Sequence, residues 1–163
     1  MKEDKIGNLL KISLESFEER VCANPQVDCL QGEIVRVLKD LSKAVTRSEY
    51  VPSTPTTDNP SLSEDYIFDT NDEKLVLKDL TKEHFVAKIK DLGKGACNRK
   101  QKGLQQEYLY VFQYPCKMYR RDLEESGIDL ENVLIYIKIN NRKVPYKKIF
   151  VVSFHKNRIK LER

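Results

Sequence analysis

The fold is decided by two apolar stretches near the C-terminus, Val133-Leu134-Ile135-Tyr136-Ile137-Lys138-Ile139 and Ile149-Phe150-Val151-Val152-Ser153-Phe154-His155. Both are rich in β-branched and aromatic residues, which favour strands. Side chains alternate between the two faces of a strand, so the first stretch would turn one wholly aliphatic face to the core. In the second stretch, Phe150, Val152 and Phe154 would form the more apolar face. We therefore predict two neighbouring strands, over residues 132–139 and 148–155.

Upstream residues complete a small domain. An aromatic-rich third strand is predicted over residues 107–114, ending at Pro115. Thr81 is a suitable N-cap for a helix from Lys82 to about Leu92, which glycines would end. A short strand is predicted over residues 74–77. The sequence thus predicts an α+β domain over residues 66–163, with a helix packed on a small antiparallel β-sheet.

The N-terminal third predicts a different structure. Residues 3–22 predict an amphipathic helix with Glu15 and Glu18 off an apolar stripe of Ile6, Leu10, Leu14, Phe17 and Val21. After a break at Asn24-Pro25, a second helix is predicted from Asp28, with a stripe of Leu30, Ile34, Leu38, Leu41 and Val45. Two helices with a short break favour an acidic helical hairpin over residues 1–47.

A polar stretch follows the hairpin. Residues 48–65 contain three prolines among Ser, Thr, Asp and Asn. Such a composition buries too little apolar surface to offset the entropy lost on ordering. We therefore predict a flexible linker between the hairpin and the α+β domain.

Composition restricts the classes of protein to be considered. Of the 163 residues, 40% are hydrophobic, and there is no apolar run long enough to span a membrane. The N-terminus lacks the apolar segment of a signal peptide, so a cytoplasmic location is predicted. The four cysteines form no close pair of the zinc-binding kind, and the expected state is free thiols. We therefore expect no metal site and no cofactor.

Charge is divided unevenly along the chain. Residues 1–80 carry 10 Lys and Arg against 16 Asp and Glu, a net charge of −6, whereas residues 81–163 carry 19 against 9, a net charge of +10. This division favours RNA or another polyanion as a partner of the C-terminal domain, or attraction between the two halves. A solvated basic face without a partner is the alternative. The N-terminal helices are candidates for binding a protein partner.

The two C-terminal strands carry the candidate catalytic residues. If they pair as a hairpin with their core faces together, Tyr136, Lys138, Ser153 and His155 lie on one surface. An imidazole, an ammonium group and two hydroxyls suit acid–base chemistry on a phosphodiester. The alternative is an ordinary polar face of a half-exposed sheet. The outcome depends on the register of the strands.

Basic and aromatic residues supply candidate nucleic-acid contacts. Arg99, Lys100 and Lys102 lie in a predicted glycine-flanked loop, and Arg120 and Arg121 follow the third strand. Both groups are natural phosphate contacts. One face of the third strand carries aromatic side chains that would stack on bases if exposed and form core if buried: Tyr108, Tyr110, Phe112 and Tyr114.

The order of these elements resembles a known group. The stretches 133–139 and 149–156, after a helix and a basic loop, resemble the closing strands of small ribonuclease toxins, the barnase–EndoU–RelE-like group that includes the MqsR type. The resemblance covers about residues 80–160. It implies a metal-independent endoribonuclease with an antiparallel sheet that carries the catalytic side chains.

The resemblance also implies a mechanism. His155 or Lys138 would take the proton from a ribose 2′-OH, and the other would protonate the leaving oxygen. Tyr136 shares their surface, and Arg121 or a lysine of the 99–102 loop would stabilise the added negative charge. The acidic N-terminal helices would be an interaction module or a built-in shield. The alternative function is a non-enzymatic nucleic-acid- or protein-binding accessory factor of phage or mobile-element origin.

Overall fold

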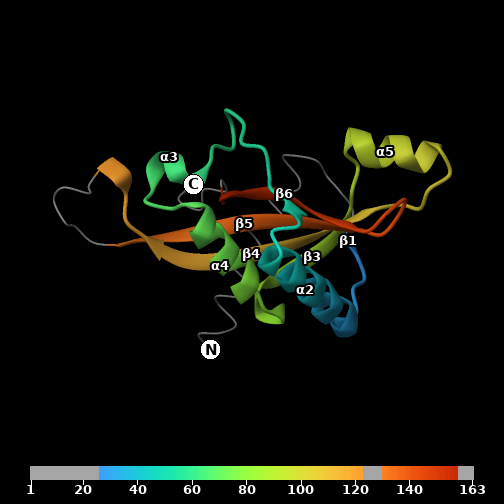
Figure 1. Ribbon diagram of the computed structural model, residues 1–163, viewed down its shortest axis with the longest axis horizontal. Helices are drawn as coiled ribbons and strands as arrows, with labels where there is room; N and C mark the ends of the chain where they lie inside the picture. The colour runs from blue at the N-terminus through green and yellow to red at the C-terminus, as the bar shows by residue number, and fades with distance from the viewer. Residues whose placement is uncertain (1–25, 123–129, 158–163) are drawn as a thin grey trace.

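The computed structural model describes residues 26–122 and 130–157, which form helices and a six-stranded mixed sheet (Figure 1). The strands follow the order β1-β3-β4-β5-β6-β2. Their bounds are β1 Gln26–Val27, β2 Tyr50–Val51, β3 Phe85–Lys90, β4 Tyr108–Met118, β5 Glu131–Arg142 and β6 Lys148–Lys156. All neighbours are antiparallel except β2, which runs parallel to β6. The predicted combination of helices with a sheet is confirmed, but the sheet is mixed rather than purely antiparallel.

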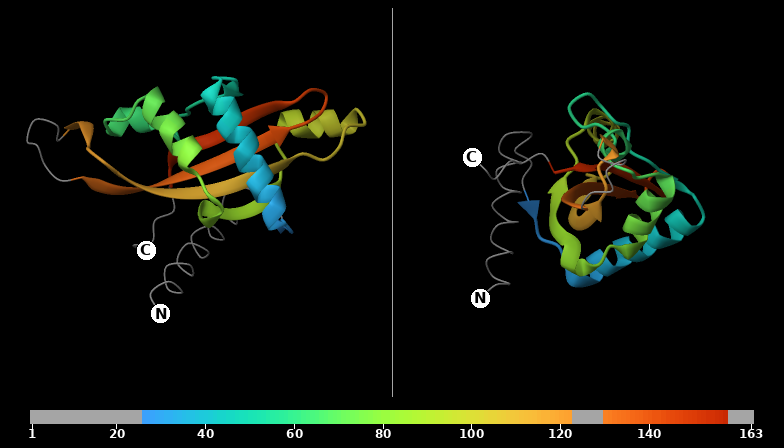
Figure 2. Two further views of the ribbon diagram at one scale, coloured as in Figure 1. Left: turned by 60° about the horizontal axis from the view of Figure 1, so that its bottom comes forward. Right: turned by 90° about the vertical axis from the view of Figure 1, so that its left-hand side faces the viewer.

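The helices cover mainly one side of this sheet. They are α2 (Gln31–Thr46), α3 (Leu62–Asp65), α4 (Thr70–Asp79), the short 3-10 helix η1 (Lys82–His84) and α5 (Lys94–Gln101). Helices α2 and α4 lie against one another and across the same face, which we call the helix face (Figure 2). Helices α3 and α5 lie at opposite ends of the sheet (Figure 1).

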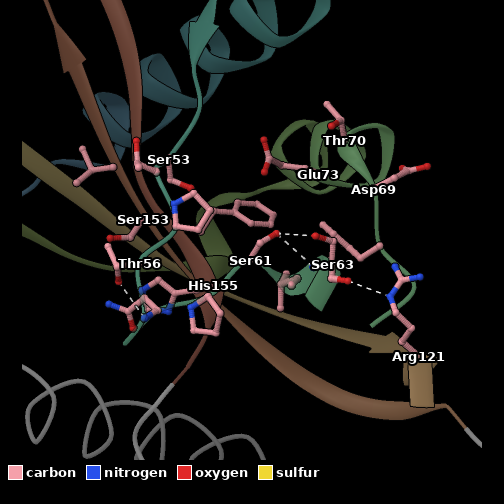
Figure 3. A pocket seen from close by; sticks show the side chains of 18 residues that line it. Ser53, Thr56, Ser61, Ser63, Asp69, Thr70, Glu73, Arg121, Ser153 and His155 are labelled. Atoms are coloured by element: carbon pink, nitrogen blue, oxygen red, sulfur yellow. Dashed lines mark hydrogen bonds between the residues drawn. The ribbon is translucent and has the colours of Figure 1, made fainter. Parts of the chain in front are cut away.

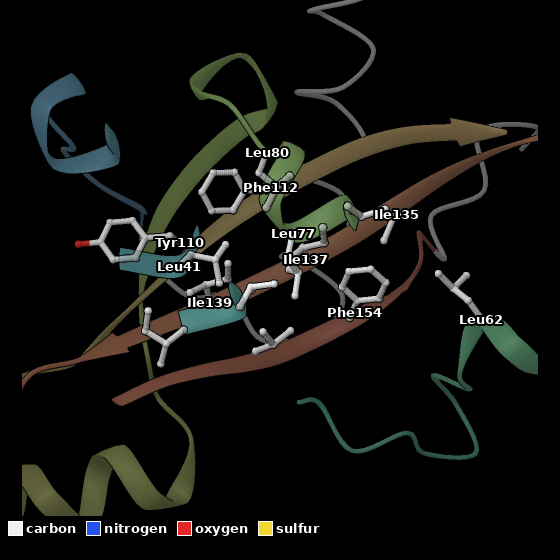
Figure 4. Packing of buried hydrophobic residues seen from close by; sticks show 14 of the residues in the cluster. Leu41, Leu62, Leu77, Leu80, Tyr110, Phe112, Ile135, Ile137, Ile139 and Phe154 are labelled. Atoms are coloured by element: carbon white, nitrogen blue, oxygen red, sulfur yellow. The ribbon is translucent and has the colours of Figure 1, made fainter. Parts of the chain in front are cut away.

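The main hydrophobic core fills the space between the helix face and α2 and α4 (Figure 4). The predicted aliphatic face is confirmed, since Ile135, Ile137 and Ile139 are fully buried there. The second predicted helix is also confirmed as α2, whose Leu41 and Val45 join the same cluster. Burial of such side chains is the main force that holds the helices on the sheet.

The predicted linker contains more structure than its composition indicates. Residues 48–65 include β2, which extends the sheet beside β6, and α3, which Ser61 caps. Because α2 and the sheet share one hydrophobic cluster, the two chain segments that flank this stretch are packed together. The division into domains over 1–47, 48–65 and 66–163 stays a prediction. The predicted helix over residues 3–22 lies outside the described residues.

Two predicted elements upstream of β4 are wrong. Residues 74–77 belong to α4 instead of a strand, because Asp69 and Asp72 form a capping box that starts a helix at Thr70. Thr81 does act as an N-cap, but only of η1. From Phe85 the chain becomes β3 instead of a helix to Leu92, because pairing with β4 satisfies its backbone groups in a sheet.

Two further boundaries differ from the prediction. Gly93 begins a helix instead of ending one, so the predicted basic loop is α5. Strand β4 continues through Pro115 to Met118. Among the described strands, β3 pairs with β4 only as far as Phe112, so Pro115 lies at a free edge of the sheet on that side. A proline is tolerated there because its missing N–H removes no ladder hydrogen bond on the free side.

Candidate active site on the second face of the sheet

The strand register brings three polar side chains into one line across the face opposite the helices, which we call the second face. Tyr136 on β5 is directly opposite Gln113 on β4 and His155 on β6. Directly opposed residues in an antiparallel pair have Cβ atoms about 4.5–5.5 Å apart. Gln113, Tyr136 and His155 therefore form a continuous group, which we call the polar row.

A second pair lies beside the polar row. Lys138 is opposite Ser153, two residues along each strand from Tyr136 and His155. The predicted pairing of these four residues on one surface is therefore confirmed. The ammonium nitrogen of Lys138 lies 5.5 Å from the centroid of the Tyr136 ring, and the rings of Tyr136 and His155 have centroids 5.5 Å apart.

A β-bulge changes which residues of β6 face the core. The register shifts after the Lys138–Ser153 pair, so that Ile139 faces Val151 and no residue of β5 is paired with Val152. Val152 is consequently exposed, and Ile149 and Val151 are buried on the same face as Phe154. The predicted apolar face of Phe150, Val152 and Phe154 is therefore wrong, because simple alternation does not account for the extra residue.

The polar row is buried instead of solvated. Gln113, Tyr136 and His155 are 3%, 1% and 6% exposed, whereas Lys138 and Ser153 are half-buried. His155 is therefore a buried imidazole, although the sequence analysis placed it on a surface of the sheet. Within residues 26–122 and 130–157, neither polar atom of the Gln113 side chain has a hydrogen-bond partner. A buried amide without a partner is costly, so the place of Gln113 in this row is not explained by fold stability alone.

The backbone holds the His155 ring in a defined tautomer. Its Nδ1 lies 2.9 Å from the carbonyl oxygen of Lys156, and a carbonyl can only accept. Nδ1 must therefore carry the hydrogen and donate it. The neutral ring then keeps its lone pair on Nε2, which is the nitrogen that can act as a base.

A cavity of about 450 Å³ ends against Ser153 and His155. It lies between β6, the segment from Ser53 to Ser63 that leads into α3, and the start of α4, and Figure 3 shows Arg121 on the side opposite His155. Arg121 donates from Nε to the carbonyl oxygen of Ser63 and from Nη2 to that of Tyr66, at 3.0 and 3.1 Å. The guanidinium is thus held by the backbone at the edge of the same cavity as the imidazole.

Glu73 is the acidic side chain in this cavity whose pKa is raised. Burial raises the pKa of its carboxyl group above the ordinary value, although Tyr50 donates a hydrogen bond of 2.9 Å to its Oε2 atom. Burial and the same hydrogen bond also raise the pKa of the Tyr50 hydroxyl. Glu73 therefore lines the cavity as a carboxyl group that accepts a hydrogen bond from Tyr50 on β2.

The predicted phosphate contacts lie on different elements and are partly neutralised. Arg99 on α5 forms an ion pair with Glu107, and Lys100 donates to the side chain of Gln106 at 2.8 Å. Arg120 forms a bidentate pair with Asp122 at 2.9 and 3.1 Å. Lys102 is exposed at the end of α5. Their role in binding nucleic acid stays a prediction.

A basic cleft that sequence analysis missed lies between α2 and the turn joining β5 to β6. Its volume is about 500 Å³, and its basic lining residues are Lys43, Arg47, Lys147 and Lys148. Asp40 also lines it and binds Lys143 and Lys147 at 2.9 and 3.4 Å. Because α2 lies in the acidic half of the sequence, the net charge of that half concealed the basic side of this helix.

Gln113 was also missed. It is the one amide in β4, where it follows the run Tyr-Leu-Tyr-Val-Phe. Gln113 lies on the same face of the strand as Leu109 and Val111. The sequence signal for Gln113 was a polar residue at the two-residue spacing of the buried aliphatic side chains. The aromatic residues on the other face of β4 include Tyr110 and Phe112, which are buried in the main core, as the core interpretation expected.

The described part of the chain lacks two further features. It holds no cluster of three or more His, Cys, Asp or Glu side chains arranged to bind a metal ion. It also holds no helix that is long and apolar enough to cross a membrane. The thiols of Cys29, Cys97 and Cys116 are free.

Comparison with known proteins identified no relative of this chain. The chain matches no protein-family model, no curated protein and no solved structure.

Proposed function

We propose that the protein is a metal-independent endoribonuclease that cleaves RNA on the second face of its sheet. The observation that carries the proposal is the alignment of Gln113, Tyr136 and His155 across three strands, with Lys138 and Ser153 beside them. These side chains offer a base, an ammonium group, a phenol and an amide within one patch. Burial of the unpaired Gln113 amide beside them is costly for folding, and functional sites are where such costs are retained.

The chemistry follows from the tautomer of the His155 ring, in which Nδ1 carries the hydrogen. Nε2 of His155 takes the proton of a ribose 2′-OH, and the 2′ oxygen attacks the adjacent phosphorus. The bond from phosphorus to the 5′ oxygen breaks, and Lys138 gives this oxygen a proton. The products are a 2′,3′-cyclic phosphate and a 5′-hydroxyl. No oxidant, reductant or cofactor enters this balance.

The spacing of the two acid–base groups fits a phosphodiester. His155 and Lys138 occupy diagonal positions of an antiparallel pair, and such positions are about 7–8 Å apart. The phosphate group would lie between them, over Tyr136. The Tyr136 hydroxyl and the Gln113 amide are the donors that would stabilise the negative charge added at the non-bridging oxygens.

Attraction of RNA to the protein is supported by charge. The net charge of residues 81–163 is +10, and α2 adds Lys43 and Arg47 to the basic cleft. Exposed lysines and arginines bind the phosphate backbone without reading sequence. We propose that this cleft binds the part of the RNA that lies outside the catalytic patch.

The test is cleavage of an RNA oligonucleotide by the full chain in the presence of EDTA. We expect products with a 2′,3′-cyclic phosphate, and no cleavage of a substrate with one 2′-deoxyribose at the cleavage site, because that sugar lacks the nucleophile. Cleavage that EDTA abolishes, or that continues at the deoxy position, would contradict the proposal.

The second candidate is a non-enzymatic factor that binds nucleic acid, or binds a protein through its N-terminal segment. The basic cleft favours the nucleic-acid form of this alternative, because it needs no access to the buried row. Binding of RNA that weakens steeply with salt, without cleavage under any condition tested, would support it instead.

A further inference from the structure

Strand β6 has an open edge on the side away from β5. Its neighbour on that side is β2, which pairs only with Ile149 and Phe150. The strand β2 ends before Pro52, and the chain then leaves the sheet. Within the described residues, no strand lies beside residues 152–156 on this side. The open stretch is about 13 Å long, which is enough for a short added strand.

The strand register shows which backbone groups point to this open edge. The N–H of Asn157 donates to the carbonyl oxygen of Leu134 at 2.8 Å, so these two residues form a hydrogen-bonded pair. Hydrogen-bonded and non-hydrogen-bonded pairs alternate along an antiparallel ladder. Lys156 and Phe154 therefore belong to non-hydrogen-bonded pairs with β5. Their N–H and C=O groups point away from β5, towards the open edge.

The backbone of Phe154 lacks a partner on this side. The carbonyl oxygen of Lys156 accepts the hydrogen bond from the His155 ring. Among residues 26–122 and 130–157, no loop or side chain supplies a hydrogen bond to the N–H or C=O of Phe154. Phe154 is buried, and buried backbone groups without a partner are rare in folded proteins. Unpaired N–H and C=O groups at a sheet edge are a template for another strand.

The cavity that ends against His155 lies directly beside this edge (Figure 3). Residues 152–155 of β6 line it on one side, and residues of the segment 53–63 line it on another. Because β2 runs parallel to β6, its direct continuation would have passed beside residues 152–154. The cavity of about 450 Å³ thus occupies the place of a strand that β2 begins and does not continue. An added strand would lie about 4.8 Å from β6.

The walls of the cavity indicate which side chains such a strand would carry. Side chains of a strand point alternately to its two sides. Towards the helix face the cavity is lined by Phe68 and Phe154, whose ring centroids are 6.0 Å apart, and by Leu62. Towards the second face it is lined by Ser153 and His155. A segment that alternates apolar and polar side chains fits these two walls.

Arg121 adds a preference for negative charge. Its guanidinium donates to two backbone carbonyls, and within the described part of the chain it forms no ion pair. Two carboxylates line the same cavity, but both have other partners: Asp69 accepts from the N–H of Asp72, and Glu73 accepts from Tyr50. An acidic side chain on the bound segment would complement the guanidinium.

We propose that the open edge of β6 binds an extended peptide segment of a partner protein, which joins the sheet as an added strand in this cavity. The backbone of the segment pairs with Phe154 and Lys156, and this pairing supplies affinity. Its side chains alternate between apolar and polar, with an Asp or Glu at Arg121, and they supply specificity. The interaction does not depend on the proposed ribonuclease function.

The first test measures hydrogen exchange of the β6 amides in the full chain by NMR. The amides of Phe154 and Lys156 should exchange at least about tenfold faster than those of Ser153 and His155, which are paired with β5. Equally slow exchange at all four positions would show that the edge is already covered, and it would overturn the proposal.

The second test adds a synthetic peptide, acetyl-Ser-Val-Thr-Val-Asp-Val-Ser-amide, to the full chain. The amides of Phe154 and Lys156 should then become protected, while those of Ser153 and His155 stay unchanged. Two matched peptides carry N-methyl groups either on the three Val residues or on Thr and Asp. Successive N–H groups of a strand point to opposite edges, so only one of these peptides should lose affinity, by at least about tenfold. Equal affinity of the two, or no binding of the parent peptide at about 1 mM, would overturn the proposal.

A pair of variants tests the charge preference. Arg121→Gln should weaken binding of the parent peptide about tenfold, as measured by fluorescence anisotropy of a labelled copy. Lys117→Gln removes an exposed positive charge of β4 outside the cavity and should leave the affinity unchanged. Cooperative thermal unfolding shows that each variant is folded. Equal affinities of the two folded variants would overturn the assignment of Arg121. An RNA oligonucleotide that protects the Phe154 amide where the peptide does not would overturn the proposal and assign the cavity to nucleic acid.

Discussion

The two faces of the central sheet differ in the side chains that β5 contributes to each of them. On the helix face, Ile135, Ile137 and Ile139 pack against α2 and α4 in one aliphatic core. On the second face, the same strand carries Tyr136 and Lys138 among polar neighbours from β4 and β6. The helix face is explained by hydrophobic burial. The second face is equally buried in its polar row, and burial of polar groups opposes folding unless they are well paired.

Under the proposed function, this difference separates residues that stabilise the fold from residues that carry the chemistry. A substitution on the helix face should change the free energy of unfolding, whereas one in the polar row should change activity. The β-bulge beside Lys138 separates the two patterns, because it places Ser153 and His155 on the second face while Val151 remains in the core.

The largest effect is expected at His155. His155→Gln removes the proposed base but keeps a side chain of similar size, and we expect the rate of RNA cleavage to fall by about 10²–10⁴. The melting temperature should change far less than the activity. Val152→Ala, an exposed position on the same strand, is the control and should retain activity. Single-turnover cleavage in EDTA measures the cleavage rates of both variants. Unchanged cleavage by the His155→Gln variant would show that His155 is not the acid–base residue.

The next effect concerns stability and has a different outcome on each face. Ile137→Ala creates a cavity in the main core and should lower the free energy of unfolding by about 2–5 kcal/mol. Gln113→Leu replaces a buried amide with an apolar group of similar volume, and should leave stability unchanged or raise it while lowering cleavage. Urea unfolding measures the free energies. A loss at Gln113→Leu as large as at Ile137→Ala would mean that the amide is structural.

The smallest effect is expected at the ion pairs that join α2 to the turn between β5 and β6. Burial alone would raise the pKa of Asp40, but hydrogen bonds from Asn141 and Lys143 and the charges of Lys143 and Lys147 together lower it to about 2. This lowered pKa means that the unfolded chain binds the proton of the Asp40 carboxyl group more tightly than the folded protein does. Asp40 therefore stabilises the fold above pH 4, and this contribution is lost as the pH falls towards 2.

Asp40→Asn should consequently lower the free energy of unfolding at pH 7 by about 1–2 kcal/mol, a discounted figure because Lys143 and Lys147 are exposed. Below pH 2 the variant and the natural protein should be equally stable. Urea titrations between pH 2 and pH 7 check this. A difference that is independent of pH would show that the carboxylate charge is not the cause.

Part of this architecture could be read from the chain alone. The strands β5 and β6 and helix α2 were predictable because each carries a long, regular apolar pattern. The grouping of Tyr136, Lys138, Ser153 and His155 also followed from the sequence, since strand alternation and a core-to-core hairpin leave few other arrangements. Helix α4 could have been recognised from Asp69 and Asp72, which form its capping box.

Other features were decided only by tertiary contacts. Phe85 and Ile89 are four residues apart, a spacing that fits a helix, but pairing with β4 makes this segment a strand. The bulge opposite Lys138 follows from the fit between β5 and β6, and no local pattern predicts it. Gln113 joined the polar row only when β4 was placed beside β5. The sequence by itself determined the periodic elements, because their information is local. The tertiary structure decided the register and burial of the polar row, because those depend on residues that are distant along the chain.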